Sequence, residues 1–189
     1  MTDTFDRERS VSCLRKVFLI NVLILGMMVL ISSGFYETND DNYLSAIIYG
    51  AWGNSASNVV YINSLLSTLL YVIHNSLPSV PVYYIFQLLL ILASLTIVSY
   101  VVVKKSSSRS SYLMITAFAL FFGYECYVKM QYTKTAAIAT LAGLCLLFML
   151  RDKNVWHMIG GMLLSYSGFL LRKESFILIS AILLPNIVC

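Results

Sequence analysis

Two neighbouring carboxylates and a scattered set of cations are the residues of this sequence best suited to chemistry. Asp40 and Asp41 follow soon after the first apolar segment. A carboxylate can act as a general base and take a proton from an attacking hydroxyl group. Arginine and lysine can bind a phosphate leaving group and stabilise the charge that develops on it. The cations that we consider for this task are Lys129, Lys134, Arg172 and Lys173.

The elements that must position these residues are membrane helices. Of the 189 residues, 59% are hydrophobic and 12% are charged, and the mean hydropathy is +0.79. Ordinary soluble domains are about 45–50% apolar and about 25% charged. A helix needs about 20 apolar residues to cross about 30 Å of hydrocarbon. The composition therefore predicts an all-α membrane protein and argues against a water-soluble fold.

Apolar stretches recur along the chain, and we expect about six membrane-embedded helices from them. They cover 17–34, 83–103, 112–124, 135–150, 155–171 and 175–189. Several are shorter than a full span, so tilt or flanking aromatic residues must make up the length. The sequence stops inside the last stretch, and we expect the bundle to be incomplete there. The predicted domains are an N-terminal tail, 1–16, and a single helical transmembrane domain, 17–189.

The loop at 35–82 is predicted to carry an amphipathic helix that lies at the membrane interface. Leucines such as Leu65 and Leu69 recur there at helical spacing, with polar residues between them. Pro78 and Pro81 end that helix before the next span begins. The loop is therefore expected to stay at the membrane surface.

Basic residues indicate which helix ends face the cytoplasm, because cytoplasmic loops are rich in lysine and arginine. On this rule we assign to the cytoplasm Arg7, Arg9, Arg15, Lys16, Lys104, Lys105, Arg109, Arg151 and Lys153. The predicted localisation is an integral, multi-pass membrane protein with a cytoplasmic N-terminus. A cleaved signal peptide is the alternative, with Ser32 and Gly34 as the small residues near the cut.

The other four basic residues and five of the nine acidic residues then share the outer face. They are Glu37, Asp40, Asp41, Glu125, Lys129, Lys134, Arg172, Lys173 and Glu174. Cations on that face run against the usual bias, so each of them needs a partner or a task. The arrangement predicts a reaction chamber at the level of the lipid headgroups.

Simpler interpretations exist for the same residues. Asp40 and Asp41 could be the charges of a solvated loop. Lys129 could form an i,i+4 salt bridge with Glu125, which stabilises a helix only slightly. Arg172 and its charged neighbours could be a helix-end cluster that reaches toward water.

Other residues favour packing or exclude other kinds of site. Thr135, Ala139 and Gly143 form a small-residue stripe that allows close helix packing. The four cysteines lack metal-ligand spacing and predict neither a zinc site nor a disulfide framework. The basic residues lie in short clusters rather than along one face, so nucleic acid is not an expected partner.

The order of these parts resembles the GT-C superfamily of multi-spanning glycosyltransferases. The matching segments are Glu37-Thr-Asn-Asp40-Asp41-Asn-Tyr, Tyr61-Ile-Asn-Ser-Leu-Leu-Ser-Thr-Leu-Leu-Tyr71, Gln131-Tyr-Thr-Lys-Thr-Ala-Ala137 and Gly168-Phe-Leu-Leu-Arg172-Lys-Glu174. The resemblance implies that a sugar passes from a polyprenyl-phosphate donor to a cell-surface glycan or lipid-linked acceptor, at the outer face of a bacterial plasma membrane. This sequence departs from the family in having fewer spans and in carrying a pair of aspartates.

The resemblance also implies roles for the charged residues. An acidic residue of the first outer loop would be the catalytic base, with Asp40 preferred and Asp41 orienting it. Arg172, Lys129, Lys134 and Lys173 would bind the donor phosphate. No cofactor is certain, and a divalent cation such as Mg²⁺ or Mn²⁺ would be held by the two aspartates.

Three other functions remain open from the sequence. A polysaccharide repeat-unit polymerase would share the phosphate-binding cations but would need a second lipid-linked substrate. A transporter or flippase component would need ionisable residues near the middle of the membrane, and these are scarce here. A scaffold subunit would have no site at all.

Overall fold

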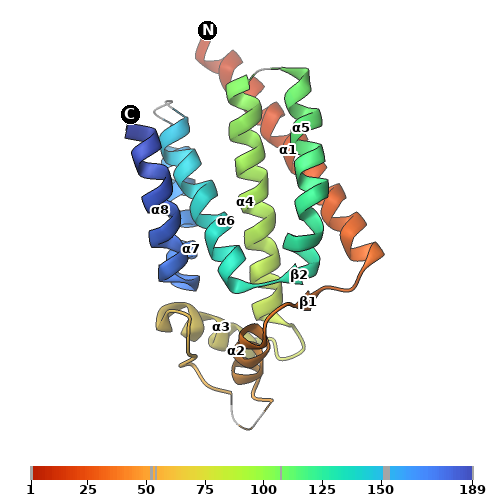
Figure 1. Cartoon of the computed structure of the whole chain (residues 1–189), viewed down its shortest axis with the longest axis vertical. Coiled ribbons are helices and arrows are strands. Elements are labelled where there is room, and N and C mark those ends of the chain that lie inside the picture. The colour runs from red at the N-terminus through yellow and green to blue at the C-terminus, as the bar shows by residue number, and fades with distance from the viewer. Residues whose placement is uncertain (1, 52, 54, 107, 151–153, 189) are drawn as a thin grey trace.

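The computed structural model describes residues 2–51, 53, 55–106, 108–150 and 154–188. Most of its helices run along the long axis of the molecule, while α2 (Asn39–Tyr49) and α3 (Ser64–Ser76) gather at one end (Figure 1). We call this the α2–α3 end, and both chain termini lie at the opposite end. The long-axis helices are α1 (Thr2–Ile31), α4 (Val82–Ser106), α5 (Arg109–Gly123), α6 (Tyr132–Leu144), α7 (Val155–Leu171) and α8 (Lys173–Val188).

The helical segments have the length and the surface of membrane spans. Four described segments are long and apolar enough to cross a bilayer: Ser10–Ile31, Val82–Ser106, Ser110–Val128 and Tyr132–Met149. The shorter apolar helix α7 runs beside them. Large apolar side chains such as Leu113, Phe121 and Trp156 are more than 70% exposed, as expected where the outer surface faces lipid. The prediction of an all-α membrane protein is confirmed.

Small residues bring α6 and α7 into close contact. A Cβ atom added to Gly143 would lie 2.6 Å from the backbone oxygen of Gly161, and one added to Gly168 would lie 2.7 Å from that of Ala136. Gly143 of the predicted stripe lies at this contact, but Ala136 and Thr140 complete it in place of Thr135, whose hydroxyl donates to Gln87 of α4 (Val82–Ser106). This contact holds the start of α6 beside the end of α7.

Irregular elements extend and connect the helices. The π-helical turn η1 (Tyr124–Val128) extends α5 at the α2–α3 end, and the π-helical turn η2 (Cys145–Met149) extends α6 at the opposite end. The two-residue strands β1 (Phe35–Tyr36) and β2 (Lys129–Met130) pair in parallel. This pairing ties the loop after α1 to the connection between α5 and α6.

Element boundaries differ from the predicted ones in instructive places. Helix α7 has the predicted bounds, and the helix expected in the loop at 35–82 is α3. Helix α1 begins well inside the predicted tail, at Thr2. Helix α2 was not expected, because its first turn consists of polar residues that also suit a loop. Arg151 and Lys153, which we assigned to the cytoplasm, lie outside the described residues.

Candidate functional site

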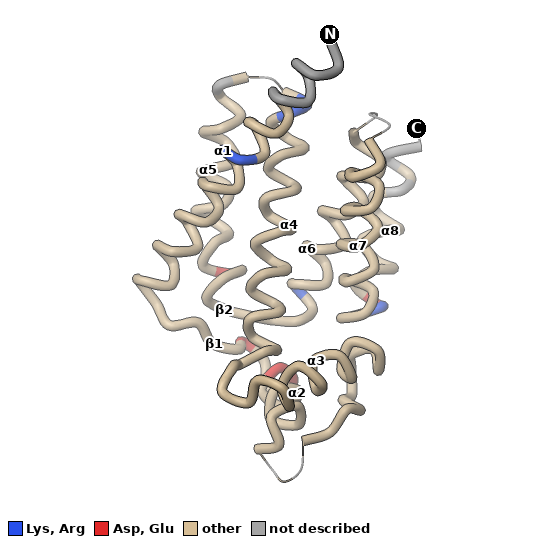
Figure 2. Tube along the Cα trace, turned by 180° about the vertical axis from the view of Figure 1, so that it is seen from behind, with Lys and Arg blue, Asp and Glu red and all other residues tan. Residues whose placement is uncertain are grey.

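The α2–α3 end gathers the residues that the sequence singled out. Asp40 and Asp41 lie in the first turn of α2. Lys129 lies in β2 and Lys134 in the first turns of α6, while Arg172 and Lys173 lie where α7 gives way to α8. Figure 2 shows acidic and basic residues from these separate elements at this end of the bundle. The structure therefore brings their backbones to one end, but it gives the side chains very different surroundings.

Asp41 is completely buried and is surrounded by hydrogen-bond donors. The hydroxyl of Tyr83 donates to Oδ1 at 2.7 Å, and the side-chain amide of Gln87 donates to the same oxygen at 3.1 Å. The hydroxyl of Thr38 donates to Oδ2 at 2.9 Å. Thr38 is also the N-cap residue of α2, while Tyr83 and Gln87 belong to α4. The carboxylate thus fastens α2 to the start of α4.

The same carboxylate also caps α6. The backbone N–H of Tyr132, the first residue of α6, points between its two oxygens, at 3.1 and 3.3 Å. A negative charge at a helix N-terminus is favourable, because the free N–H groups there carry partial positive charge. Burial raises the pKa of the Asp41 carboxyl, and the four hydrogen bonds oppose that rise. Asp41 is therefore placed to hold the fold together rather than to exchange protons with a substrate.

This donor set does not fit a divalent cation at Asp41. Protein donors already occupy both oxygens, and a cation there would meet the hydrogens of N–H and O–H groups rather than further carboxylate or carbonyl oxygens. Among the described residues, no group of three or more histidine, cysteine, aspartate or glutamate side chains comes together.

Asp40 lies one residue earlier and has the opposite surroundings. Its side chain is exposed, and no hydrogen bond or ion pair joins it to any residue in the described part of the chain. Its charge acts on the nearby phenol of Tyr132. Of the two aspartates, Asp40 is the one that can meet a substrate.

Arg172 is held at the end of α7 by the first turn of α6. Its Nη1 donates to the Tyr132 hydroxyl at 2.9 Å and to the Thr133 hydroxyl at 2.5 Å. Its guanidinium also lies over the Tyr132 ring, 5.1 Å from the centroid. Glu174 is a looser partner, with its carboxylate 3.8 Å from Nε. One edge of the guanidinium is thus fixed, and the other remains available.

Arg172 borders a cavity of about 390 Å³. Its polar lining consists of Tyr61, Asn63, Tyr132, Arg172, Lys173 and Glu174. Asn63 is the N-cap of α3, and Lys173 is the first residue of α8, so two helix N-termini border the cavity. Both contribute partial positive charge in addition to the two cations. Glu174 and the C-terminal end of α7 also border the cavity and oppose this positive charge. Two cations and two helix N-termini outweigh them, so the lining favours an anion.

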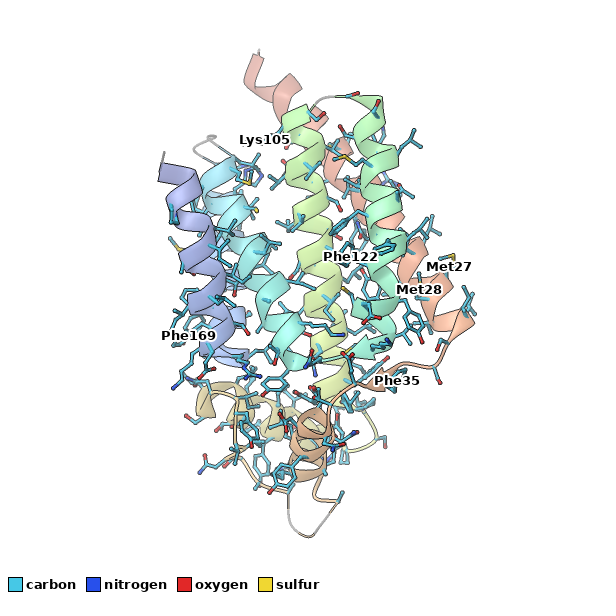
Figure 3. The ribbon with its side chains drawn as sticks, in the orientation of Figure 1. Met27, Met28, Phe35, Lys105, Phe122 and Phe169 are labelled. Carbon is cyan, nitrogen blue, oxygen red and sulfur yellow. The ribbon has the colours of Figure 1, made fainter. Side chains whose placement is uncertain are left out.

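Backbone conformation, a backbone hydrogen bond and an aromatic ring shape the lining of this cavity. Tyr61 has a φ angle of 75°, a left-handed conformation that is uncommon for a bulky residue and often occurs at functional sites. The backbone N–H of Asn63 donates to the backbone oxygen of Leu170 at 2.9 Å, which fixes the start of α3 against α7. Phe169, labelled in Figure 3, gives the cavity an apolar wall at the α3 end of α7.

Lys129 and Lys134 are held in ion pairs instead. The predicted salt bridge is confirmed, with Lys129 Nζ 2.8 Å from Glu125 Oε1. Lys134 Nζ lies 2.5 Å from a Glu37 oxygen and 3.5 Å from a Glu125 oxygen. Neither lysine lines the cavity beside Arg172. We call these four residues the paired cluster.

The sequence interpretation missed the polar residues that organise Asp41 and Arg172. Tyr83, Gln87 and Tyr132 are buried, and their roles depend on contacts between distant segments. Gln87 was the detectable one, because an amide inside a predicted apolar span needs a partner. It donates to Asp41 and accepts a hydrogen bond from the Thr135 hydroxyl at 3.0 Å.

Comparison with known proteins adds no relative. No family model matches the sequence, and neither a curated protein nor a solved structure matches it.

Proposed function

We propose that this chain is a membrane glycosyltransferase that moves a sugar from a polyprenyl-phosphate donor to a glycan or lipid-linked acceptor. The observation that carries the proposal is the cavity beside Arg172, where a fixed guanidinium, Lys173 and two helix N-termini favour an anion. In this proposal the α2–α3 end faces outward, and the donor phosphate occupies the cavity. Arginine suits that task because its planar fork can hold two phosphate oxygens.

The apolar surface next to the cavity supports a lipid-linked donor. A shallow groove of about 460 Å³ runs along α3 and is lined by Ser64, Leu65, Thr68, Leu69 and Val72. It begins at Ser64, directly after Asn63 of the cavity lining. An amphiphile could place its anionic head in the cavity and its long apolar chain in the adjoining groove along α3.

The chemistry follows from the two aspartates and the cations. Asp40 takes the proton of an acceptor hydroxyl while that oxygen forms a bond to the anomeric carbon of the sugar. The bond from that carbon to the phosphate oxygen breaks, and its electron pair leaves with the polyprenyl phosphate. Arg172 and Lys173 stabilise the charge that develops on the leaving phosphate. Asp41 keeps α2, and with it Asp40, in place.

A transfer assay tests this proposal. Membranes that contain the chain are given polyprenyl-phosphate sugars that are labelled in the sugar. We expect Asp40→Asn to reduce transfer at least about 100-fold, because a positioned general base typically contributes that much. Asp40→Glu should restore part of the activity. Arg15→Ala, at the opposite end of the bundle, should leave both insertion and transfer unchanged.

The outcomes separate the competing functions. Full transfer by Asp40→Asn would remove Asp40 as the base. Products longer than one added sugar would indicate a repeat-unit polymerase. Absence of any transfer, together with normal insertion, would count against the enzyme.

A further inference from the structure

Tyr132 joins the two halves of the site, although it is neither the proposed base nor a proposed phosphate ligand. Its backbone N–H donates to Asp41, and its hydroxyl accepts a hydrogen bond from Arg172 Nη1. Its ring lies beneath the same guanidinium, and its side chain is only 2% exposed. One residue therefore contacts the buried carboxylate through its backbone and the phosphate-binding cation through its side chain.

These contacts fix where the guanidinium points. Arginine is long and has many rotamers, so a free side chain at the end of α7 would spread its charge over a wide volume. The Tyr132 ring blocks one face of the guanidinium, and the hydroxyls of Tyr132 and Thr133 hold Nη1. Within the described residues, no hydrogen-bond partner is bound to Nη2. The remaining edge of the fork is left for the cavity that both residues line.

The position of Tyr132 is itself fixed independently of Arg172. As the first residue of α6, it is held by the Asp41 cap on its N–H. Loss of the hydroxyl alone would leave this cap, the ring and the helix in place. The side-chain hydroxyl can therefore be removed without disturbing the Asp41 network.

We propose that Tyr132 is the positioning residue for Arg172, and that its hydroxyl aims the guanidinium at an anionic headgroup in the cavity. The proposal rests on the proposed function for the identity of that headgroup, a lipid phosphate. It does not depend on the transfer reaction itself. Tyr132 touches the cation rather than the reacting atoms, so it acts through Arg172.

A double-mutant cycle tests the role of the hydroxyl. The chain is reconstituted in lipid nanodiscs, and its affinity for farnesyl phosphate is measured by calorimetry. We expect Tyr132→Phe to weaken binding about 10-fold, which corresponds to about 1.4 kcal/mol. In an Arg172→Ala background, the same substitution should cause no further loss, because the hydroxyl would act only through the arginine.

Two controls separate positioning from general damage. Tyr166→Phe also removes a hydroxyl, but from an exposed tyrosine whose ring stacks on Phe169, and it should leave binding unchanged. The thermal unfolding midpoint of Tyr132→Phe should equal that of the unaltered chain. The positioning role would be overturned if Tyr132→Phe reduced the affinity by the same factor with and without Arg172, or if it reduced the affinity in neither background.

Kinetics distinguish this inference from the proposed function. If sugar transfer occurs, Tyr132→Phe should raise KM for the donor about 10-fold and change kcat less than about 2-fold. If the binding cycle is non-additive but no transfer occurs, the positioning role stands and the glycosyltransferase proposal fails. If transfer occurs but the binding cycle is additive, the glycosyltransferase proposal stands and the positioning role of Tyr132 fails.

Discussion

The paired cluster and the Arg172 cavity are two groups of charges at the same end of the bundle, and they use their cations differently. In the paired cluster, Lys129 and Lys134 face the carboxylates of Glu37 and Glu125 at 2.5–3.5 Å. At the cavity, Arg172 is held mainly by two neutral hydroxyls and keeps an open edge. A location shared by several cations therefore does not give them a shared task. The partner of each cation decides whether its charge remains available to a ligand.

The same contrast divides the two aspartates. Asp41 has four donors and no exposed surface, whereas Asp40 is exposed at the next position of the same helix. A carboxylate whose oxygens already accept hydrogen bonds from the protein stabilises the fold. A carboxylate without such partners can accept a proton from a ligand. Substitutions of each kind of residue test whether its hydrogen-bond partners decide its role.

The largest effect is expected at Asp41. Asp41→Asn replaces one acceptor oxygen by an NH₂ group that cannot accept. At the Oδ2 position this group leaves the Thr38 hydroxyl without its acceptor, and at the Oδ1 position it leaves Tyr83 and Gln87 without theirs. A lost acceptor costs about 1–3 kcal/mol, and the negative charge at the start of α6 is lost as well, so we expect the free energy of unfolding to fall by about 3 kcal/mol. Chemical unfolding in detergent micelles measures it. Asp40→Asn is the matched control and should change stability by less than about 0.5 kcal/mol. Equal losses of stability in Asp41→Asn and Asp40→Asn would contradict the different roles given to the two aspartates.

Sequence reasoning reached the bundle but not this network, for a physical reason. Apolar stretches and flanking charges are local signals, so α7 could be predicted with its bounds, Val155–Leu171, from its own residues. Asp41 meets Tyr83 and Tyr132 across separations of 42 and 91 positions. Such contacts depend on how three helices pack, and the sequence of a single segment does not indicate that packing.

The short elements were missed because their signals are weak. The strands β1 and β2 have two residues each, too few for a pattern of alternating side chains. Helix α2 begins with an asparagine and two aspartates, residues that are as common in turns as at helix starts. The candidate cations could be named from their positions at helix ends, but their partners could not. Only the folded structure separates Lys134 from Arg172.

The next effect compares those two cations directly. Arg172→Ala should weaken the binding of farnesyl phosphate about 100-fold, since truncation of a charged group that contacts a phosphate typically costs 2–3 kcal/mol or more. Lys134→Ala should change binding less than about 2-fold, because its charge is already used by Glu37 and Glu125. Calorimetry on the chain in nanodiscs measures both affinities. A loss of 10-fold or more in Lys134→Ala would assign the paired cluster to ligand binding and break the comparison.

The smallest effect concerns the pH dependence of the paired cluster. The hydrogen bond and charge of Glu125 raise the pKa of Lys129 above its ordinary value of 10.5. A cation whose pKa is raised by folding contributes stability that is fully present below its unfolded-state pKa. That contribution is lost as the pH rises from about 10.5 through the folded-state pKa. The ion pair is partly exposed, with Lys129 at 32%, so solvent screens it and the change should be slight.

A matched comparison isolates this small term from the other groups that titrate at high pH. Thermal unfolding midpoints of the unaltered chain and of Lys129→Met are recorded between pH 8 and about pH 12, a range set by the lysine pKa. The difference between the two proteins should be constant at the lower pH values and should shrink above about pH 10.5. Addition of salt should shrink it at every pH, because exposed ion pairs are screened. A difference that stayed constant to the highest pH would mean that Lys129 stabilises the chain by packing rather than by its charge. The paired cluster would then be a packing feature rather than an electrostatic one, and its contrast with the Arg172 cavity would need another cause.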